Sequence, residues 1–398
     1  FGDMYVYESK DRISQLPDEI LRHILIFTDI NVAVQTSILS TRWKNLWRSL
    51  PDLHFHLTRF AAHTYFPLKS YEAAQTLSHR FSDFISHFLS HRDSATTIRS
   101  FHLSFDSSKV YAHHEFIENC LHYAINHGVQ SLRLHANYYS HGSMFLASKR
   151  LRELELIKFS CVTYLPQHFS FPHLKTLYLE SYRFTGDFTI SDEPFSGFPE
   201  LEKLTLRRCN VSGLVVKAPR LRFLEIIDET NSSYFDQEMR MGEISAPLLT
   251  SFSYEGFFAF ECSKVDLPVL EHVYFDIYKR VHVKGMHLKC VRMLQQFGNA
   301  TTVALTLDTL KVLESDGDFI KRSPSPFPYM KCLKLIKGRW DISTVLQCVM
   351  NYLTVETLHC DSLVVEFPRG VDVVEQNLED LSDDDDSDLI QRLKLLFE

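Results

Sequence analysis

The stretch L-K-T-L-Y-L at residues 174–179 is the clearest copy of a pattern that recurs along most of the chain. Related stretches open at Leu201 and Leu221, and successive copies from Ile98 to Val355 start 20 to 32 residues apart. In each copy the alternating apolar residues fit one buried face of a short strand. A single repeat cannot bury its own face, so the copies are expected to stack into an α/β solenoid with a curved parallel sheet.

The spacing of the copies separates this fold from a β-sandwich. Strands of a sandwich recur every 8–12 residues, roughly, which is much closer than here. Proline also precedes the first apolar position by two residues in several copies, where it gives an extended entry and prevents continuation of a preceding helix. These prolines are Pro172, Pro199, Pro219, Pro247, Pro268 and Pro328.

Composition is that of a packed globular protein. The 398 residues are 45% hydrophobic and 23% charged, and no apolar run approaches the roughly 18 residues of a membrane span. The net charge of −8 is carried by residues 375–388, which hold eight acids and no Lys or Arg. The remainder is neutral, so we expect a solvated acidic tail, no overall electrostatic footprint for nucleic acid, and no membrane partner.

Known motifs for chemistry are missing from the sequence. No two glycines lie closer than Gly186 and Gly197, which excludes the glycine-rich phosphate loops and the nucleophile elbow. The eight cysteines form no C-x-x-C pair. We therefore expect no enzyme, no metal and no cofactor, and a reducing compartment, the cytoplasm or nucleus. The chain opens at Phe1 without a signal segment, which suggests an incomplete or processed N-terminus.

Residues 11–55 predict three short helices. Pro17 suits a first helical position, and Ile20, Leu21 and Ile24 belong to one apolar stripe. Asn31 is a candidate cap for the second helix, and Ser40 or Thr41 for the third, which carries two tryptophans. Helices this short cannot bury so much apolar surface alone, so another domain or another protein is expected to cover some of it.

The same stretch resembles a known family. L-P-D-E-I-L-x-x-I-L, from Leu16, followed by A-V-x-T-S-x-L-S-x-R-W-K-x-L-W, from Ala33, is similar to the F-box of plant F-box and leucine-rich-repeat proteins. Amphipathic helices are expected at 71–91 and 111–126, like the linker and first repeat of that family. The segment from Phe327 to Leu335, with a helix at 342–352, resembles the start of an FBD segment.

The resemblance implies a domain plan. It places an N-terminal extension at 1–10, the F-box at 11–55, a helical linker at 56–97 and leucine-rich repeats at 98–325. The last repeats with a partial FBD-like segment follow at 326–372, and the acidic C-terminal tail occupies 373–398.

The resemblance also implies a function. Such a chain is the substrate-recognition subunit of an SCF-type ubiquitin ligase, in which the F-box docks on an Skp-family adaptor held by a cullin and the repeats capture a target protein. Two alternatives stay open: a leucine-rich-repeat scaffold without a ligase role, and a small-ligand receptor of the auxin-receptor type.

Candidate site residues follow from these patterns. Residues expected to divide between helix packing and the adaptor interface are Leu16, Pro17, Ile20, Leu21, Ile24, Leu39, Trp43 and Trp47. The fifth and seventh positions of each L-x-x-L-x-L-x copy should lie on the concave sheet, where targets of solenoids usually bind. The target-binding candidates are Tyr178, Glu180, Arg207, Glu255, Tyr274, Asp276 and Asp308. Their acidic majority favours a target with a basic segment.

Overall fold

The computed structural model falls into two compact units, Phe1–Val273 and Tyr274–Glu398. It describes residues 13, 15–64, 71–105, 110–137, 145–158, 163–164, 168–184, 193–228, 240–278, 285–316, 320, 323–340, 342–354, 357 and 363–374. The predicted extension at 1–10 and almost all of the predicted acidic tail lie outside these residues. The six-part domain plan stays a prediction.

The F-box segment forms short helices, as its sequence predicts. They are α1 (Asp18–Ile26), α2 (Ile30–Gln35) and two 3₁₀ helices, η1 (Thr36–Ile38) and η2 (Trp43–Ser49). The cap of α2 is Asp29, whose carboxylate accepts the Asn31 N–H at 3.3 Å, so the expectation that Asn31 itself caps this helix is wrong. Ser40 accepts the Trp43 N–H at 3.4 Å at the start of η2.

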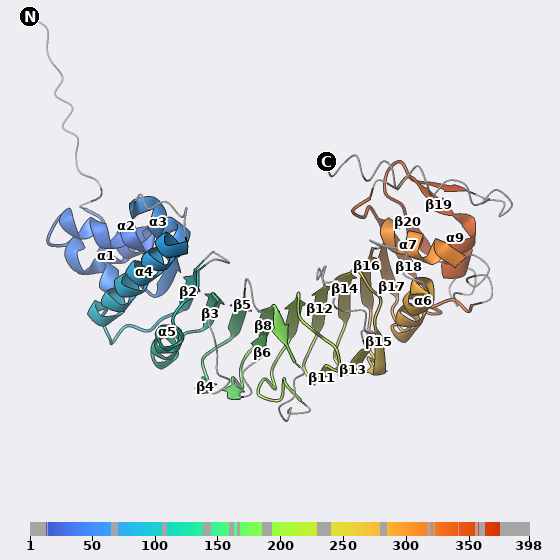
Figure 1. Ribbon diagram of the computed structural model, residues 1–398, viewed down its shortest axis with the longest axis horizontal. Helices are drawn as coiled ribbons and strands as arrows, with labels where there is room; N and C mark the ends of the chain where they lie inside the picture. Colours follow the sequence, from blue (N-terminus) through green and yellow to red (C-terminus); the bar gives the residue numbers. More distant parts are fainter. Residues whose placement is uncertain are drawn as a thin grey trace, which may run out of the picture. The chain divides into compact units, whose positions relative to one another are not determined.

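The strand that follows the F-box helices was not expected. Residues Asp52–His56 form β1, which pairs in parallel with β2 (Ser100–Ser104), so the sheet begins well before Ile98. Between these two strands lie α3 (Leu57–Thr64) and the long α4 (Tyr71–His91), and α5 (His114–Asn126) follows β2. The two longer helices confirm the amphipathic helices predicted from the sequence (Figure 1).

The main sheet of the first unit continues in chain order with parallel strands. They are β3 (Ser131–His135), β5 (Glu153–Ile157), β8 (Thr176–Glu180), β10 (Lys203–Arg207), β12 (Phe223–Asp228) and β14 (Ser251–Gly256). Equivalent repeat positions face each other: Leu177 pairs with Leu204, and Leu204 with Leu224. These side chains are buried and form ladders of apolar contacts from repeat to repeat. The stacked α/β solenoid is therefore confirmed.

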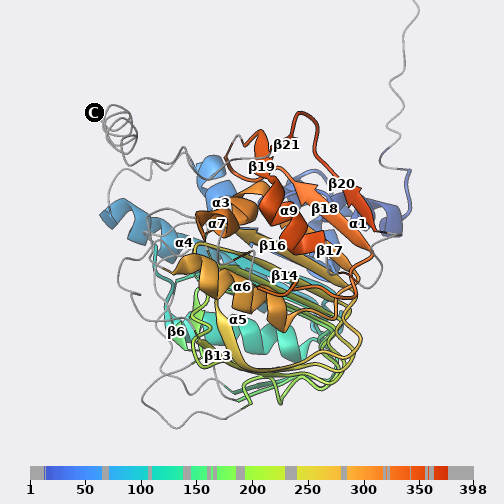
Figure 2. The same cartoon turned by 90° about the vertical axis from the view of Figure 1, so that its right-hand side faces the viewer.

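Shorter strands lie on the connections that follow β3, β5, β8, β10, β12 and β14. The pairs are β4 (Phe145–Ala147) with β7 (His168–Ser170), and β6 (Thr163–Tyr164) with β9 (Tyr182–Arg183). A parallel three-stranded sheet contains β11 (Val215–Lys217), β13 (Arg240–Ser245) and β15 (Glu261–Asp266). In Figure 2 two of these strands, β6 and β13, are labelled below the main-sheet strand β14. Apolar residues of these shorter strands, such as Val216 and Ile244, are also buried, so such repeats have apolar residues on both inner faces.

The second unit repeats this construction with more helix. Strand β16 (His272–Ile277) spans the boundary between the units. Beyond it come α6 (Met286–Gln296), β17 (Thr302–Thr306), α7 (Leu307–Leu313), η3 (Glu314–Asp316) and β18 (Cys332–Ile336). Last come β19 (Thr344–Leu346), α9 (Gln347–Thr354), β20 (Val364–Glu366) and β21 (Asp372–Val374). Strand β18 pairs in parallel with β17 and β20, and β19 with β21.

Candidate protein-interaction surfaces

The apolar residues of the F-box divide into an inner and an outer set. Leu21 is fully buried, and Trp43 and Trp47 are also buried. The exposed fractions of Ile20, Ile24 and Leu39 are 45%, 40% and 65%. Leu16 is half-buried and Pro17 exposed. The sequence pattern shows which residues are apolar, but the helix packing decides which of them remain free to meet a partner.

Contacts of Arg42 and Trp47 fix the packing around the inner set. Arg42 joins the last helix to the first, since its Nε donates to Asp18 Oδ1 at 2.7 Å and its Nη2 donates to the carbonyl of Leu16. The Trp47 ring packs on Phe88 of α4 with centroids 4.9 Å apart, and its Nε1 donates to the Lys44 carbonyl at 3.1 Å. Trp47 therefore packs against the linker helix α4, and the burial of Trp43 places it in the interior as well.

Further exposed apolar residues extend the outer set. Ile13, Phe27 and Ile38 are exposed in the same segment and were not among the predicted residues. Phe27 directly follows α1, and Ile38 ends η1 beside Leu39. Large aliphatic and aromatic side chains gathered in so short a segment are typical of a protein-binding surface. Their strong apolar character was visible in the sequence, but their exposure was not.

The predicted target-binding residues of the first unit fall into two groups. Tyr178, Arg207 and Glu255 are half-buried on the polar face of the sheet. Glu180 is buried, accepts the Tyr178 hydroxyl at 2.8 Å and pairs with Arg208. Burial raises the pKa of Tyr178. The expectation that Glu180 lies exposed is therefore wrong. Its buried carboxylate, at the end of β8, forms an ion pair with Arg208.

Of the predicted target-binding residues in the second unit, most are buried. Tyr274 is half-buried, whereas Asp276 and Asp308 are buried. Asp276 Oδ1 accepts the Thr306 hydroxyl at 2.7 Å, and Asp308 Oδ2 accepts the Arg339 N–H at 2.6 Å. Burial raises the pKa of Asp308. Both carboxylates serve internal hydrogen bonds, so the expected placement of Asp276 and Asp308 on an exposed acidic stripe is wrong.

A histidine cluster on β1, β2 and β3 was missed by the sequence analysis. We define it as His54, His56, His102 and His135. The His102 ring lies 4.5 Å from the His56 ring and 4.6 Å from the His135 ring, between centroids. Burial, reinforced by the neighbouring imidazoles, lowers the pKa of His102 to about 3. The cluster is hidden in the sequence because β1 lacks the repeat pattern that identifies the other strands.

An acidic residue borders the histidine cluster. Glu155 on β5 accepts from His135 Nε2 at 2.6 Å, and this hydrogen bond lowers the pKa of Glu155. Arg133 lies 3.5 Å from the same carboxylate. This part of the polar face therefore combines histidine rings in edge-to-face contact with a carboxylate that is paired within the sheet. Its chemistry differs from the acidic majority predicted for the target-binding candidates.

Comparison with known proteins finds matches to both the F-box segment and the repeats. The F-box domain model matches residues 13–55, and a model described as FBD-associated F-box protein At5g56370, LRR repeats, matches residues 143–360. The second match covers more than half of the chain. The chain belongs to the plant F-box/LRR-repeat family. The predicted resemblance is confirmed, including the FBD association.

Relatives of this F-box/LRR protein come from Arabidopsis thaliana. F-box/LRR-repeat protein At5g02910 is 26% identical over 379 residues, covering 89% of this chain and 74% of the relative. Putative F-box/LRR-repeat protein At5g02930 is 29% identical over 372 residues, covering 86% and 70%. Putative F-box/LRR-repeat protein At3g18150 is 27% identical over 344 residues, covering 82% and 65%. The similarity thus runs through the F-box and the repeats together.

The described part of the F-box/LRR structure lacks the features of two other kinds of site. Among the described residues, none of the helices combines the length and the apolar character that a membrane crossing requires. Within the same residues, His, Cys, Asp and Glu side chains nowhere form a group of three or more suited to a metal ion.

Proposed function

We propose that this F-box/LRR protein is the substrate-recognition subunit of an SCF-type ubiquitin ligase. The observation that carries the proposal is the exposure of Ile20, Ile24 and Leu39 on the F-box helices. Burying large aliphatic side chains against a partner is favourable by about 25 cal/mol per Å² of apolar surface. An Skp-family adaptor is the proposed partner, and a cullin is reached through it. The proposed location is the cytoplasm or nucleus.

The proposed contribution to ubiquitylation is proximity, without bond-making by this chain. A receptor that holds a target beside a ubiquitin-charged enzyme raises the effective concentration of the target's lysines. Within the first unit, Arg92 connects the end of the F-box to the repeats through its hydrogen bond to the Leu50 carbonyl. Such a connection suits a receptor that must present its target in a defined direction.

Target capture is proposed for the polar face of the sheet in the first unit. Tyr178, Arg207 and Glu255 are half-buried there, and the histidine cluster lies on the same series of strands. Aromatic residues and arginine are enriched among residues that dominate binding energy. Glu255 remains available to bind a basic segment of the target. Because Glu180 is buried, fewer acidic side chains are available for that contact than the sequence predicted.

The adaptor proposal is tested by co-purification with a recombinant Skp-family adaptor. The double variant Ile24→Glu with Leu39→Glu places two charges on the outer set and should lose the adaptor. The matched control is Leu248→Glu, since Leu248 has an exposed fraction of 45% in the repeats. A second variant, Leu16→Ala with Pro17→Ala, should weaken binding while the solenoid stays folded. Wild-type recovery of adaptor by the Glu double variant would contradict the ligase role and favour a scaffold.

A further inference from the structure

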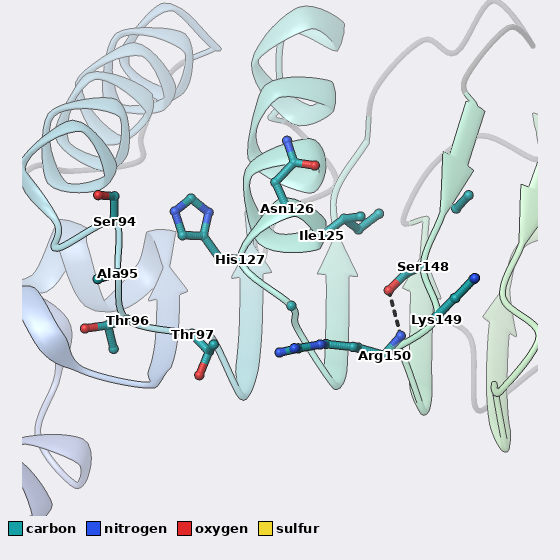
Figure 3. Close-up of a pocket in the computed structure, with 12 residues that line it drawn as sticks. Ser94, Ala95, Thr96, Thr97, Ile125, Asn126, His127, Ser148, Lys149 and Arg150 are labelled. Atoms are coloured by element: carbon teal, nitrogen blue, oxygen red, sulfur yellow. Dashed lines mark hydrogen bonds between the residues drawn. The ribbon is translucent and has the colours of Figure 1, made fainter.

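A pocket of about 590 Å³ opens in the first unit, at the end of the sheet where the strands begin. Three segments line it: residues 94–97 after α4, residues 125–128 at the end of α5, and residues 147–150 between β4 and β5 (Figure 3). Its volume lies in the range of small-molecule sites, which is roughly 300–1,000 Å³. None of the adaptor or target candidates belongs to it.

The charge of this pocket is entirely positive. Arg150 and Lys149 line it, and no Asp or Glu does. Within the described part of the chain, neither side chain has a hydrogen-bond or ion-pair partner, and both are exposed. The acid beside it in sequence, Asp93, is engaged locally, because its carboxylate accepts the Ala95 N–H and the Thr96 hydroxyl, each at 3.0 Å. An anion entering the pocket therefore meets cations with no competing carboxylate among the lining residues.

A local hydrogen bond fixes the backbone of Arg150. Its own N–H donates to the Ser148 hydroxyl at 3.1 Å. Gly128, with φ +76°, lies under the side chain: a methyl group there would come within 2.9 Å of Arg150 Nη1 and 3.0 Å of its Cδ. Figure 3 shows Arg150 extending toward Thr97, whereas Lys149 points away from Arg150. The guanidinium is thus the cation best placed to contact a ligand.

Neutral donors also line the pocket. Ser94 and Thr97 offer hydroxyl groups from the first segment, and Asn126 offers an amide from the second. The described residues give these three side chains no hydrogen-bond partner. The His127 ring forms a fixed wall, because it stacks on Tyr123 at 4.0 Å between centroids and its Nδ1 lies 2.8 Å from the Tyr123 carbonyl.

We infer that this pocket binds a small organic phosphate. A guanidinium matches two phosphate oxygens with parallel N–H donors, and the third oxygen is left for a hydroxyl such as that of Thr97. A carboxylate has only two oxygens and uses fewer of these donors. The remaining volume, with Ser94 and Asn126, accommodates a polar, hydroxyl-bearing body. This ligand site is separate from adaptor docking and does not depend on it.

Calorimetric titration of the full chain with glycerol 3-phosphate tests the inference, with glycerol and inorganic phosphate as comparison probes. Arg150→Gln should weaken binding of glycerol 3-phosphate about tenfold or more, because a charge-assisted hydrogen bond is lost. Thr97→Val should weaken it less. Arg59→Gln is the matched control: Arg59 is exposed on α3 and has no partner among the described residues. Circular dichroism checks that each variant is folded.

The outcomes separate the possible ligands. Saturable binding of glycerol 3-phosphate that depends on Arg150 and not on Arg59 supports the inference. Equal effects of the two arginine variants would show a general response to charge and overturn it, as would the absence of binding or equal binding of glycerol. A phosphoserine peptide provides the last arm. Arg150-dependent binding of that peptide without binding of glycerol 3-phosphate would make the site a protein-recognition site and overturn the small-ligand assignment.

Discussion

The Arg92 guanidinium donates to the Leu50 carbonyl at 3.0 Å, joining the end of α4 to the end of the F-box helices, two residues before β1. The same buried side chain donates to the carbonyls of Thr96 at 2.8 Å and Thr97 at 3.1 Å. One arginine therefore satisfies backbone oxygens from two segments that are distant in sequence. A buried carbonyl left without a donor is costly, so this contact stabilises the junction between F-box and repeats.

Arg92→Met tests the importance of that junction. Methionine retains an apolar stem but donates no hydrogen bonds, so we expect the free energy of unfolding to fall by about 3 kcal/mol. The free energy of unfolding of Arg92→Lys should lie between those of wild type and Arg92→Met, because one ammonium group does not reproduce the several N–H donors of a guanidinium. Thermal and urea unfolding measure both, with Arg59→Met as the exposed control. A melting temperature for Arg92→Met within about one degree of wild type would contradict the prediction.

Truncation of an inner-set residue of the F-box should lower stability, whereas truncation of an outer-set residue should mainly weaken adaptor binding. Leu21→Ala removes a fully buried side chain and should cost about 3 kcal/mol of stability through the cavity it leaves. Ile24→Ala, one turn further along the same helix and exposed, should change stability by less than about 0.5 kcal/mol and mainly weaken the adaptor. Urea unfolding combined with adaptor titration separates the two effects. Equal stability losses would show that Ile24 is also part of the core.

The repeats were predictable because their pattern and their energetics coincide. Leu177, Leu204 and Leu224 occupy the same repeat position and pair across neighbouring strands. Burial of one face of each strand requires apolar residues at alternate positions, so the strands can be recognised from the sequence. The F-box was predictable for a different reason, its resemblance to a family. Strand β1 was not, since His54 and His56 occupy the positions that face solvent and the repeat consensus is absent there.

The placement of acidic side chains was only partly predictable. The seventh repeat position was expected to face outward, but Asp308 lies two residues beyond the end of β17, in the first turn of α7. There it accepts backbone N–H groups from a loop more than 30 residues away, a long-range relation that no local pattern encodes. Glu180 likewise depends on Arg208, whose backbone has a positive φ of 49°. Sequence periodicity gives the face of a strand but not the partners at its end.

Asp308 and Gly338 should behave as a coupled pair. Asp308→Ala leaves the N–H groups of Arg339 and Trp340 without their acceptor and should cost about 2 kcal/mol. A methyl group at Gly338 would approach Asp308 Oδ2 to 2.3 Å, so Gly338→Ala should cost about 2 kcal/mol by overpacking.

A double-mutant cycle in urea measures the coupling between these two positions. The double variant should lose less stability than the sum of the single losses, because the methyl group no longer meets a carboxylate. Strict additivity would show that the loop adjusts independently of Asp308. The loop also carries Arg339, whose guanidinium lies 4.0 Å from the centroid of the Tyr278 ring.

The histidine cluster should make stability depend on pH. The pKa of His102 is lowered to about 3, chiefly by burial and then by His135 and His56, whereas a histidine in an unfolded chain titrates near 6.5. Between those values the unfolded state binds more protons, so stability is full above pH 6.5, roughly, and falls as the pH falls below it. Because water partly screens this ring, we expect a loss on the order of 1 kcal/mol between about pH 6.5 and about pH 5. His102→Gln should flatten this dependence in urea unfolding, while the exposed control His122→Gln should retain it. An unchanged pH profile in His102→Gln would show that the ring accepts a proton in the folded state as easily as in the unfolded chain.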